Sequence, residues 1–304
     1  MAARIIDPAV LAETYREEIR ADIARLSRPP LLVGILSAQE GPSRTYAEYT
    51  RKACEAVGVG WDLRLVPRME VEQAIRDANA DPNVDGIIVY YPVFGTDQDG
   101  YLRDLVDPMK DIEGLHPYWA RALYENRRFV DAAQTKKAIV PCTPLAVVKL
   151  VEASGISVPG NRPLAGRDVV VFNRSEVVGR PLAAMMANDG ARVVSFDVDG
   201  PQLFLPAPRE GAHEVREITV DRARALAQAD VVITGVPSRA FPLVTAAEIR
   251  PGTVCVNFST IKNFADDVVE KAGVFIPRVG TMTVTMALRN IVRLRRQAEA
   301  ESVR

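Results

Sequence analysis

The stretch from Asn173 to Pro181 combines residue types and a spacing that could bind a dinucleotide. A short β-branched run, Asp168 to Phe172, predicts a buried strand before it, and an apolar-periodic helix is expected to begin at Pro181. Gly179 lies at the turn that joins the two. The free amides and the positive dipole end of such a helix can hold a pyrophosphate.

A second predicted strand, Arg192 to Phe196, ends at Asp197. An acid about 20 residues beyond the phosphate turn can accept hydrogen bonds from the adenosine ribose hydroxyls. The usual G-x-G-x-x-G pattern is absent, and only Gly179 remains of it. On spacing alone, a dinucleotide site and a plain doubly wound turn therefore both stay open.

Helices and strands that could position these residues alternate along the whole chain. This alternation predicts an α/β fold with parallel sheets covered by helices on both faces. The predicted helices are Val10–Leu26, Thr45–Val57, Val71–Ala80, Pro144–Ala153 and Thr283–Ala298. The predicted strands are Leu31–Leu36, Trp61–Val66 and Gly86–Tyr91, followed by strands that begin at Asp168, Arg192, Asp230, Thr253 and Val274.

The length of 304 residues is enough for two domains, each with its own core. The Gly/Pro-rich segment GISVPGNRPLAG gives the candidate boundary, which predicts a first domain over 1–147 and a second over 148–279. The run from Asp199 to Val220 shows no clear periodicity and is predicted as a long loop, either functional or mobile.

Composition excludes several classes of protein. The net charge of −1, with no long basic run, argues against a nucleic-acid partner. No apolar stretch reaches the length of a membrane span, and the start shows no signal-peptide pattern. Three separated cysteines fit reduced thiols in a cytoplasmic protein, and only two histidines leave no metal site expected.

Several motifs in order along the chain resemble the methylenetetrahydrofolate dehydrogenase/cyclohydrolase family. They are TYAEYTRKACEAVG, DGIIVYYPV, KDIEGLHP, PCTP, RSEVVGRP and VGTMTVTM. VYYPVFG, NRSEVVGRPLAA, VITGVPS and KNFADDV are most similar to the monofunctional, NAD-dependent branch known from yeast.

The resemblance implies an N-terminal α/β folate-binding domain of the amino-acid-dehydrogenase-like type and a Rossmann NAD-binding domain. The C-terminal helix, 280–304, would return to the first domain. It also implies a cytoplasmic homodimer that oxidises methylenetetrahydrofolate with NAD in one-carbon metabolism and purine biosynthesis.

Two departures from the bifunctional pattern concern the folate cleft. The family carries a tyrosine and, four residues on, a lysine; here these positions are Tyr46 and Thr50. Lys52 lies about 200° around the predicted helix from Thr50 and cannot replace that lysine. The family's V-Q-L-P reads V-Y-Y-P here, so Tyr90 stands where the glutamine that contacts the lysine would be.

The chemistry decides which activity should survive these changes. Oxidation of methylenetetrahydrofolate removes a hydride and leaves a delocalised cation, so it needs positioning but no general base. The cyclohydrolase step adds water and moves protons, which requires a titratable group. Because a threonine hydroxyl cannot serve, a dehydrogenase without cyclohydrolase activity is predicted.

The remaining substrate contacts come from the resemblance. Glu113 occupies the place of the family acid that holds the pterin edge, with Asp111 as the alternative. Tyr46 would stack on the aminobenzoyl ring. The loop 278–283 lacks the family's paired glycines, so its contacts are not assigned.

The resemblance also assigns the cofactor contacts. They are Arg174, Ser175, Val178, Gly179, Asp197, Gly235, Val236, Pro237 and Asn257. Asp197 would accept from the ribose hydroxyls of NAD and repel the 2′-phosphate of NADP. Replacing Asp197 by serine is expected to leave Arg174 free to meet that phosphate.

Two other functions stay open at this point. One is a bifunctional dehydrogenase/cyclohydrolase with a relocated base. The other is a non-catalytic protein that binds folate or NAD. Joint retention of Tyr46, Glu113 and the Arg174–Ser175 turn argues against the second.

Overall fold

A computed structural model describes residues 2–38, 40–208 and 211–302. The chain forms two compact units, each built from several segments. One unit, called the dinucleotide unit because it carries the predicted dinucleotide turn, contains residues 1–11, 122–128 and 143–282. The other, called the N-terminal unit, contains residues 12–121, 129–142 and 283–304.

These units differ from the predicted boundaries at residues 1–11, 122–128, 143–147 and 280–282, all of which belong to the dinucleotide unit. Residues 1–11 belong to the dinucleotide unit because β1 (Arg4–Ile5) pairs in parallel with β11 (Val274–Ile276). Residues 122–128 also belong to it, and Arg128 donates to Asp189 at 2.6 Å. A two-residue strand and the short segment at the end of α5 (Pro117–Tyr124) carry no periodic signal, so the sequence placed both in the first domain.

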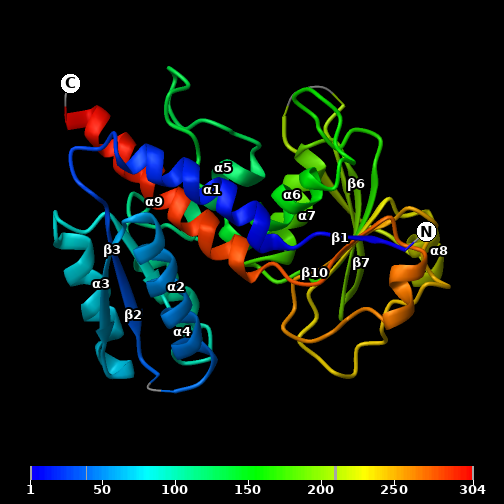
Figure 1. Cartoon of the computed structure of the whole chain (residues 1–304), viewed down its shortest axis with the longest axis horizontal. Helices are drawn as coiled ribbons and strands as arrows, with labels where there is room; N and C mark the ends of the chain where they lie inside the picture. The colour runs from blue at the N-terminus through cyan, green and yellow to red at the C-terminus, as the bar shows by residue number, and fades with distance from the viewer. Residues whose placement is uncertain (1, 39, 209–210, 303–304) are drawn as a thin grey trace. The chain divides into compact units, whose positions relative to one another are not determined.

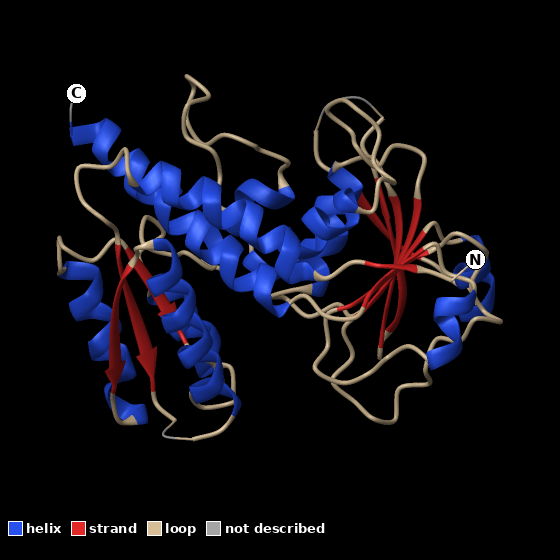
Figure 2. Cartoon of the chain, in the orientation of Figure 1, coloured by secondary structure: helices blue, strands red, loops and turns tan. Residues whose placement is uncertain are grey.

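The N-terminal unit is built around a parallel sheet in the order β3-β2-β4, with helices on both sides in Figure 2. The strands are β2 (Leu31–Leu36), β3 (Gly60–Leu65) and β4 (Gly86–Val89). The helices are α1 (Pro8–Ile23), α2 (Pro42–Val57), the 3-10 turn η1 (Arg68–Glu70), α3 (Val71–Ala80), α4 (Gln98–Leu105), α5 (Pro117–Tyr124) and α9 (Gly280–Ser302).

The core of this unit explains why the sheet forms. Val33, Ile35 and Val89 alternate on one face of the strands and pack against Ile75 of α3 and Leu102 of α4. The C-terminal helix α9 belongs to this unit from residue 283 onward, which confirms that the chain returns to its first domain. Helices α4 and α5, with eight residues each, were not predicted.

The dinucleotide unit contains one sheet in the order β1-β11-β10-β9-β5-β6-β7-β8. Its further strands are β5 (Asp168–Phe172), β6 (Arg192–Asp197), β7 (Gly200–Leu205), β8 (Glu214–Glu217), β9 (Val231–Thr234) and β10 (Val254–Asn257). Its helices are α6 (Cys142–Ala153), α7 (Gly179–Asn188), α8 (Arg222–Gln228) and the 3-10 turn η2 (Asp266–Glu270). Helices lie on both sides of this sheet in Figure 1.

The five strands predicted for this unit are confirmed as β5, β6, β9, β10 and β11. Strands β7 and β8 were missed: part of the run from Asp199 to Val220 forms an antiparallel hairpin that extends the sheet beyond β6. Helix α7 begins at Gly179, two residues before the predicted start at Pro181.

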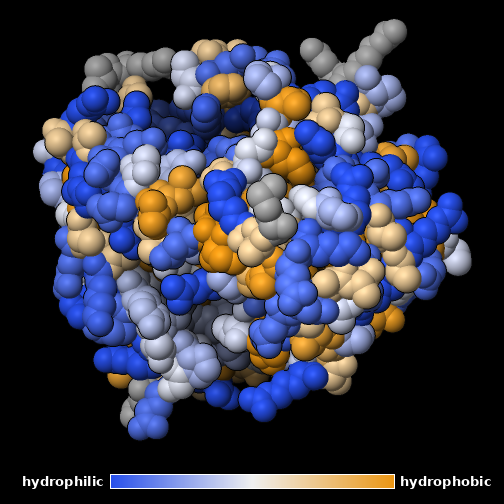
Figure 3. All heavy atoms as spheres, turned by 45° about the vertical axis from the view of Figure 1, so that its right-hand side comes forward, coloured by the Kyte–Doolittle hydropathy of each residue, from blue (hydrophilic) through white to orange (hydrophobic). Residues whose placement is uncertain are grey.

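Buried apolar side chains form a core in each unit, and the core of the dinucleotide unit includes Phe172, Val232 and Phe264. Hydrophilic side chains cover most of the face in Figure 3, with hydrophobic ones in small groups between them. Within the described residues, no helix is both long and apolar enough to span a membrane. The three cysteines, Cys54, Cys142 and Cys255, are free and buried.

Candidate active site

The predicted cofactor residues gather at the carboxyl ends of neighbouring parallel strands of the dinucleotide unit. Strand β5 has β6 on one side and β9 on the other, so the strand order reverses beside β5. Ligands of open α/β sheets bind at such a switch point. Here Asn173 donates to the carbonyl of Gly235 at 3.0 Å, which joins the ends of β5 and β9. Asn173 was not among the predicted site residues.

The turn between β5 and α7 depends on Gly179. A Cβ at this position would lie 2.1 Å from the carbonyl oxygen of Asn173, so only glycine permits this approach. Ser175 fixes the same turn, because its hydroxyl donates to Asn173 Oδ1 at 2.7 Å. The amides of Gly179 and Arg180 already bond Ser175, at 3.4 and 3.0 Å, and Pro181 has no N–H. Pyrophosphate binding at this turn therefore stays a prediction. It requires either that the amides of Gly179 and Arg180 leave Ser175 or that other backbone amides bind the phosphates.

Replacing Gly179 by alanine should raise KM for the dinucleotide by at least about tenfold, because the displaced Asn173 carbonyl opens the turn. Gly100→Ala is the matched control, since the nearest atom to its added Cβ is an Arg103 side-chain nitrogen at 3.8 Å. Steady-state kinetics of both variants measure the difference. A Gly179→Ala enzyme with unchanged KM would show that this turn does not carry the cofactor.

Asp197, the last residue of β6, is exposed and has a fixed orientation. Its carboxylate accepts from the backbone amides of Arg174 at 2.6 Å and Val198 at 2.8 Å. A carboxylate oxygen has lone pairs beyond these two bonds, so the group can still accept from ribose hydroxyls. Its place at the end of the second strand of the βαβ unit fits the predicted role.

Arg174 is not held by Asp197 through its side chain, and this corrects one expectation. Its guanidinium forms an ion pair with Asp199 and donates to the carbonyls of Ser195 at 3.0 Å and Gly200 at 2.9 Å. The side chain is only 4% exposed. Removing Asp197 would thus leave Arg174 bound to Asp199, and the arginine would not become free to meet a phosphate.

The loop after β9 is held by a residue that sequence reasoning missed. Asn263 is fully buried; its Oδ1 accepts from the amide of Val236 at 2.9 Å and its Nδ2 donates to the Val236 carbonyl at 3.1 Å. Pro237 follows as an exposed residue. Asn257 donates to the carbonyls of Ser259, Ile261 and Pro277. Its side chain therefore shapes the neighbouring loops and is engaged within the protein.

The predicted folate residues Tyr46, Thr50, Tyr90 and Glu113 lie together in the N-terminal unit. The rings of Tyr46 and Tyr90 meet edge to face, with centroids 5.8 Å apart. Thr50 is 1% exposed, and its hydroxyl donates to the Tyr46 carbonyl at 3.0 Å. Burial raises the pKa of Tyr90 well above its usual value, so its hydroxyl stays protonated. Lys52 is exposed, as its helical position predicts.

The two candidate acids have different environments. Asp111 is 4% exposed and accepts from the amides of Glu113, Gly114 and His116 at 3.0, 3.0 and 2.7 Å. The Asp111 carboxylate is thus engaged in hydrogen bonds with backbone amides of its own turn. Burial, and then the charge of Asp111, raises the pKa of Glu113 to about 8. Glu113 is the acid whose carboxyl group has capacity for a ligand with paired N–H donors.

A buried asparagine of α9 supports this cluster and was also missed. Asn290 donates to the carbonyls of Ile112 at 2.9 Å and Val140 at 3.2 Å. It therefore fixes the turn that carries Glu113 against the segment before Cys142. A single asparagine in an apolar helical pattern gives no signal of such a long-range partner.

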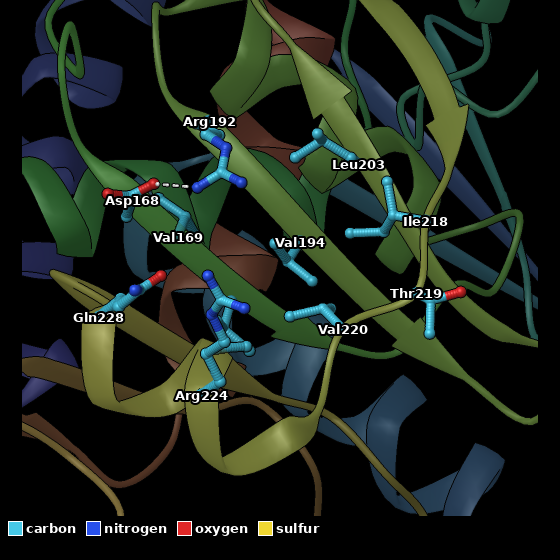
Figure 4. A pocket seen from close by; sticks show the side chains of 12 residues that line it. Asp168, Val169, Arg192, Val194, Leu203, Ile218, Thr219, Val220, Arg224 and Gln228 are labelled. Carbon is cyan, nitrogen blue, oxygen red and sulfur yellow. Dashed lines mark hydrogen bonds and ion pairs between the residues drawn. The ribbon is translucent and has the colours of Figure 1, made fainter.

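A pocket of about 230 Å³ lies in the dinucleotide unit away from these strand ends. Asp168 and Arg192, the first residues of β5 and β6, line it together with Arg224 and Gln228 of α8 (Figure 4). Since it opens at the amino ends of the parallel strands, it is not the predicted cofactor site. Within the described residues, no cluster of three or more His, Cys, Asp or Glu side chains could hold a metal ion.

A Rossmann-type dinucleotide-binding unit and a separate α/β unit with a buried acid define a two-domain, nucleotide-binding α/β protein. Residues 6–113 match the catalytic domain of tetrahydrofolate dehydrogenase/cyclohydrolase, and residues 141–205 match the NAD(P)-binding domain of the same family. The chain belongs to the tetrahydrofolate dehydrogenase/cyclohydrolase family.

Full-length relatives agree. The chain is 42% identical to methylenetetrahydrofolate dehydrogenase [NAD(+)] of Saccharomyces cerevisiae, over 97% of both chains. It is 41% identical to the Schizosaccharomyces pombe protein of the same name, over 96% of this chain and 93% of the relative. Identity to the bifunctional protein FolD of Geobacillus thermodenitrificans is 29%, over 99% and 100%.

The solved structures show the same order of similarity. The NAD-dependent 5,10-methylenetetrahydrofolate dehydrogenase from Saccharomyces cerevisiae superposes with a TM-score of 0.92 at 40% identity, covering 99% of this chain and 100% of that one. The bifunctional enzyme FolD from Campylobacter jejuni reaches a TM-score of 0.78 at 24% identity, covering 98% and 100%. The two-domain α/β fold is thereby confirmed.

Proposed function

We propose that this protein is an oxidoreductase that oxidises 5,10-methylenetetrahydrofolate to 5,10-methenyltetrahydrofolate with NAD, and that it lacks cyclohydrolase activity. The observation that carries the proposal is the likeness in sequence, at 40–42% identity over 95% or more of the chain, to three dehydrogenases named for NAD. Bifunctional relatives are less similar, at 26–29%.

The strand ends of the dinucleotide unit fit NAD. The close approach at Gly179 and the exposed carboxylate of Asp197 match the needs of a pyrophosphate turn and a ribose with free hydroxyls. When bound, NAD accepts the hydride, and the chain itself supplies orientation and electrostatics. Arg174 and Asp199 neutralise each other, so Asp197 leaves this strand end with an unbalanced negative charge that disfavours a 2′-phosphate.

The residues around Thr50 support the loss of hydrolysis. Tyr46, Thr50 and Tyr90 present hydroxyl groups and aromatic rings, and burial raises the pKa of both tyrosines. None of these three groups can exchange protons with a reacting water near neutral pH, and the remaining titratable group of the cluster, Glu113, is assigned to the pterin edge. Hydride removal needs no such exchange, so positioning by Glu113 and Tyr46 is enough for the dehydrogenase step.

A spectrophotometric assay with methylenetetrahydrofolate and each nicotinamide cofactor tests the function. We expect NADH formation and a kcat/KM for NAD at least about tenfold above that for NADP, which corresponds to roughly 1.4 kcal/mol. Equal efficiencies would contradict the cofactor assignment. Binding of both ligands without turnover would favour a non-catalytic folate- or NAD-binding protein.

The preference for NAD over NADP should fall in two steps when Asp197 and then also Asp199 are replaced. Asp197→Ser should narrow the preference for NAD by less than about tenfold, since Arg174 keeps its ion pair with Asp199. Asp197→Ser with Asp199→Ser should narrow the preference by about a further tenfold, because the Arg174 guanidinium loses its carboxylate partner. The ratio of kcat/KM values for NAD and NADP measures both steps.

Asp221→Ser is the control, as that carboxylate caps α8. An Asp197→Ser enzyme that uses both cofactors equally would show that the ion pair between Arg174 and Asp199 does not limit NADP binding.

We also infer a cytoplasmic homodimer that acts in one-carbon metabolism and purine biosynthesis, without nucleic-acid or membrane partners. The resemblance to the family and the net charge of −1 support this inference. Light scattering of the purified protein tests the dimer, and a mass of one chain would contradict it.

A further inference from the structure

A second cavity lies wholly within the N-terminal unit, where α9 passes the segment 129–137 and α1. It has a volume of about 450 Å³. Helix α9 contributes one wall with residues 289–301, and Asp22 of α1 lies at its edge. The lining residues are Asp22, Phe129, Thr135, Lys136, Lys137, Arg289, Val292, Arg293, Arg296, Gln297, Ala300 and Glu301.

The lining carries more positive than negative side chains, and its two carboxylates are already paired. Glu301 forms an ion pair with Lys136. Asp22 pairs with Arg296 at 3.4 Å and also with Arg25 at 3.6 Å. Neither acid is therefore available to neutralise the remaining arginines.

Arg289 and Arg293 are these remaining arginines. Arg289 lies over the ring of Tyr15, with its guanidinium carbon 5.2 Å from the centroid. Arg293 makes one long bond, from Nη1 to the carbonyl of Ala138 at 3.5 Å. In the part of the chain that the structure describes, no carboxylate forms an ion pair with either guanidinium.

Without a ligand, this arrangement disfavours the charged form of Arg293. Burial, followed by the charges of Arg289 and Arg296, lowers the pKa of Arg293 to about 10. A lowered arginine pKa means that the fold disfavours the charged form. Buried charges in proteins are normally paired, so a site that holds guanidinium groups without acids requires another reason.

We propose that this cavity binds a phosphorylated small molecule of nucleotide size. Guanidinium groups bind phosphate oxygens through two parallel hydrogen bonds, and arginine is the side chain of choice for this geometry. The volume is in the range of small-molecule sites and exceeds what an inorganic ion fills. Phe129 and Val292 add apolar surface for a flat ring beside the cationic residues.

The form of the site argues against a macromolecular anion. The cationic side chains line a cavity of about 450 Å³ that is partly open to solvent, and they belong to a chain with a net charge of −1. Nucleic acids and acidic proteins bind extended basic surfaces. A small, multiply charged ligand matches a cavity better.

Titration calorimetry with uridine diphosphate in phosphate-free buffer tests the proposal, in titrations without NAD and with saturating NAD. NAD is itself a phosphorylated nucleotide, so the arginine variants assign the binding event to this cavity. Saturating NAD occupies the pyrophosphate turn of the dinucleotide unit, so that turn does not compete. We expect the unmodified protein to bind uridine diphosphate in one event at this cavity and not to bind uridine. Arg293→Met and Arg289→Met should each weaken binding at least about tenfold. Arg216→Met, which removes an exposed arginine of β8, should leave it unchanged.

The thermal midpoint of the ligand-free protein gives a second readout. Arg293→Met should raise it or leave it unchanged, because it removes a partly buried charge that has no carboxylate partner, and uridine diphosphate should no longer raise it. Absence of binding, or equal binding by the unmodified protein and both arginine variants, would overturn the proposal. These measurements do not use dehydrogenase activity, so their outcome is separate from that of the proposed function.

Discussion

Replacing Glu113 by glutamine is expected to lower kcat/KM for methylenetetrahydrofolate by about 100-fold or more. A carboxylate that accepts two N–H donors from the pterin edge forms charge-assisted hydrogen bonds, each worth about 1.5–3 kcal/mol. The neutral amide would place an N–H group against one of those donors. Steady-state kinetics at saturating NAD measure the loss, and a change below about threefold would contradict the assignment.

The pH dependence follows from the same group. Because burial raises the pKa of Glu113 to about 8, the free enzyme holds it mostly neutral at pH 7. Binding of paired donors needs the carboxylate, so kcat/KM should rise with pH up to about 8 and then level off. Glu113→Gln should abolish this rise. A pH profile of kcat/KM for both enzymes checks it.

The contribution of Glu113 to the free energy of unfolding should fall as pH rises, whereas kcat/KM rises. The folded-state pKa of Glu113 lies above its unfolded value, so the cost of ionising this acid in the fold is absent below about pH 4.5 and complete above about pH 8. Glu113→Gln should thus be more stable than the unmodified protein at pH 8 and above. Thermal unfolding of both proteins at pH 5 and at pH 9 measures the difference.

The second large effect concerns Thr50. Thr50→Lys should not produce methenyltetrahydrofolate hydrolysis above the buffer rate, and it should lower the thermal midpoint by several degrees. Thr50 is 1% exposed and Tyr90 is 3% exposed, so a lysine there would bury an ammonium beside an aromatic ring, where Thr50 itself bonds only a backbone carbonyl. Decay of methenyl absorbance and thermal unfolding measure the two effects.

Thr50→Lys combined with Tyr90→Gln should give methenyltetrahydrofolate hydrolysis at about ten times the rate in enzyme-free buffer. The glutamine is smaller than the tyrosine ring and can orient the lysine amine through a hydrogen bond. Lys52→Met is the control for a relocated base, since Lys52 is exposed on the other side of α2. It should leave both activities unchanged. Full hydrolysis by the Thr50→Lys enzyme alone would show that Tyr90 does not block the site.

Periodic elements were predicted well from the sequence, because their burial is regular. Strand β2 and helix α3 have the predicted bounds, Leu31–Leu36 and Val71–Ala80. The hairpin of β7 and β8 was missed because an edge strand lacks a buried face: all four residues of β8 are exposed. Such a strand forms through its neighbour, which a local pattern does not reveal.

Side-chain pairings across the chain explain the remaining differences. Arg174 bonds Asp199 only because β6 and β7 turn back at Asp197–Gly200. Asn263 and Asn290 act on backbone groups 27 and 150 or more residues away. The sequence identifies the residue types of the site, whereas these partners depend on the tertiary structure.

One time course tests the central claim most directly: NADH and methenyltetrahydrofolate measured together during turnover of the unmodified protein with methylenetetrahydrofolate and NAD. A dehydrogenase without cyclohydrolase activity should form the two products in equal amounts, and methenyltetrahydrofolate should then disappear no faster than in enzyme-free buffer. NADH formation with a persistent, enzyme-dependent deficit of methenyltetrahydrofolate would contradict the account and show that the enzyme also hydrolyses its product.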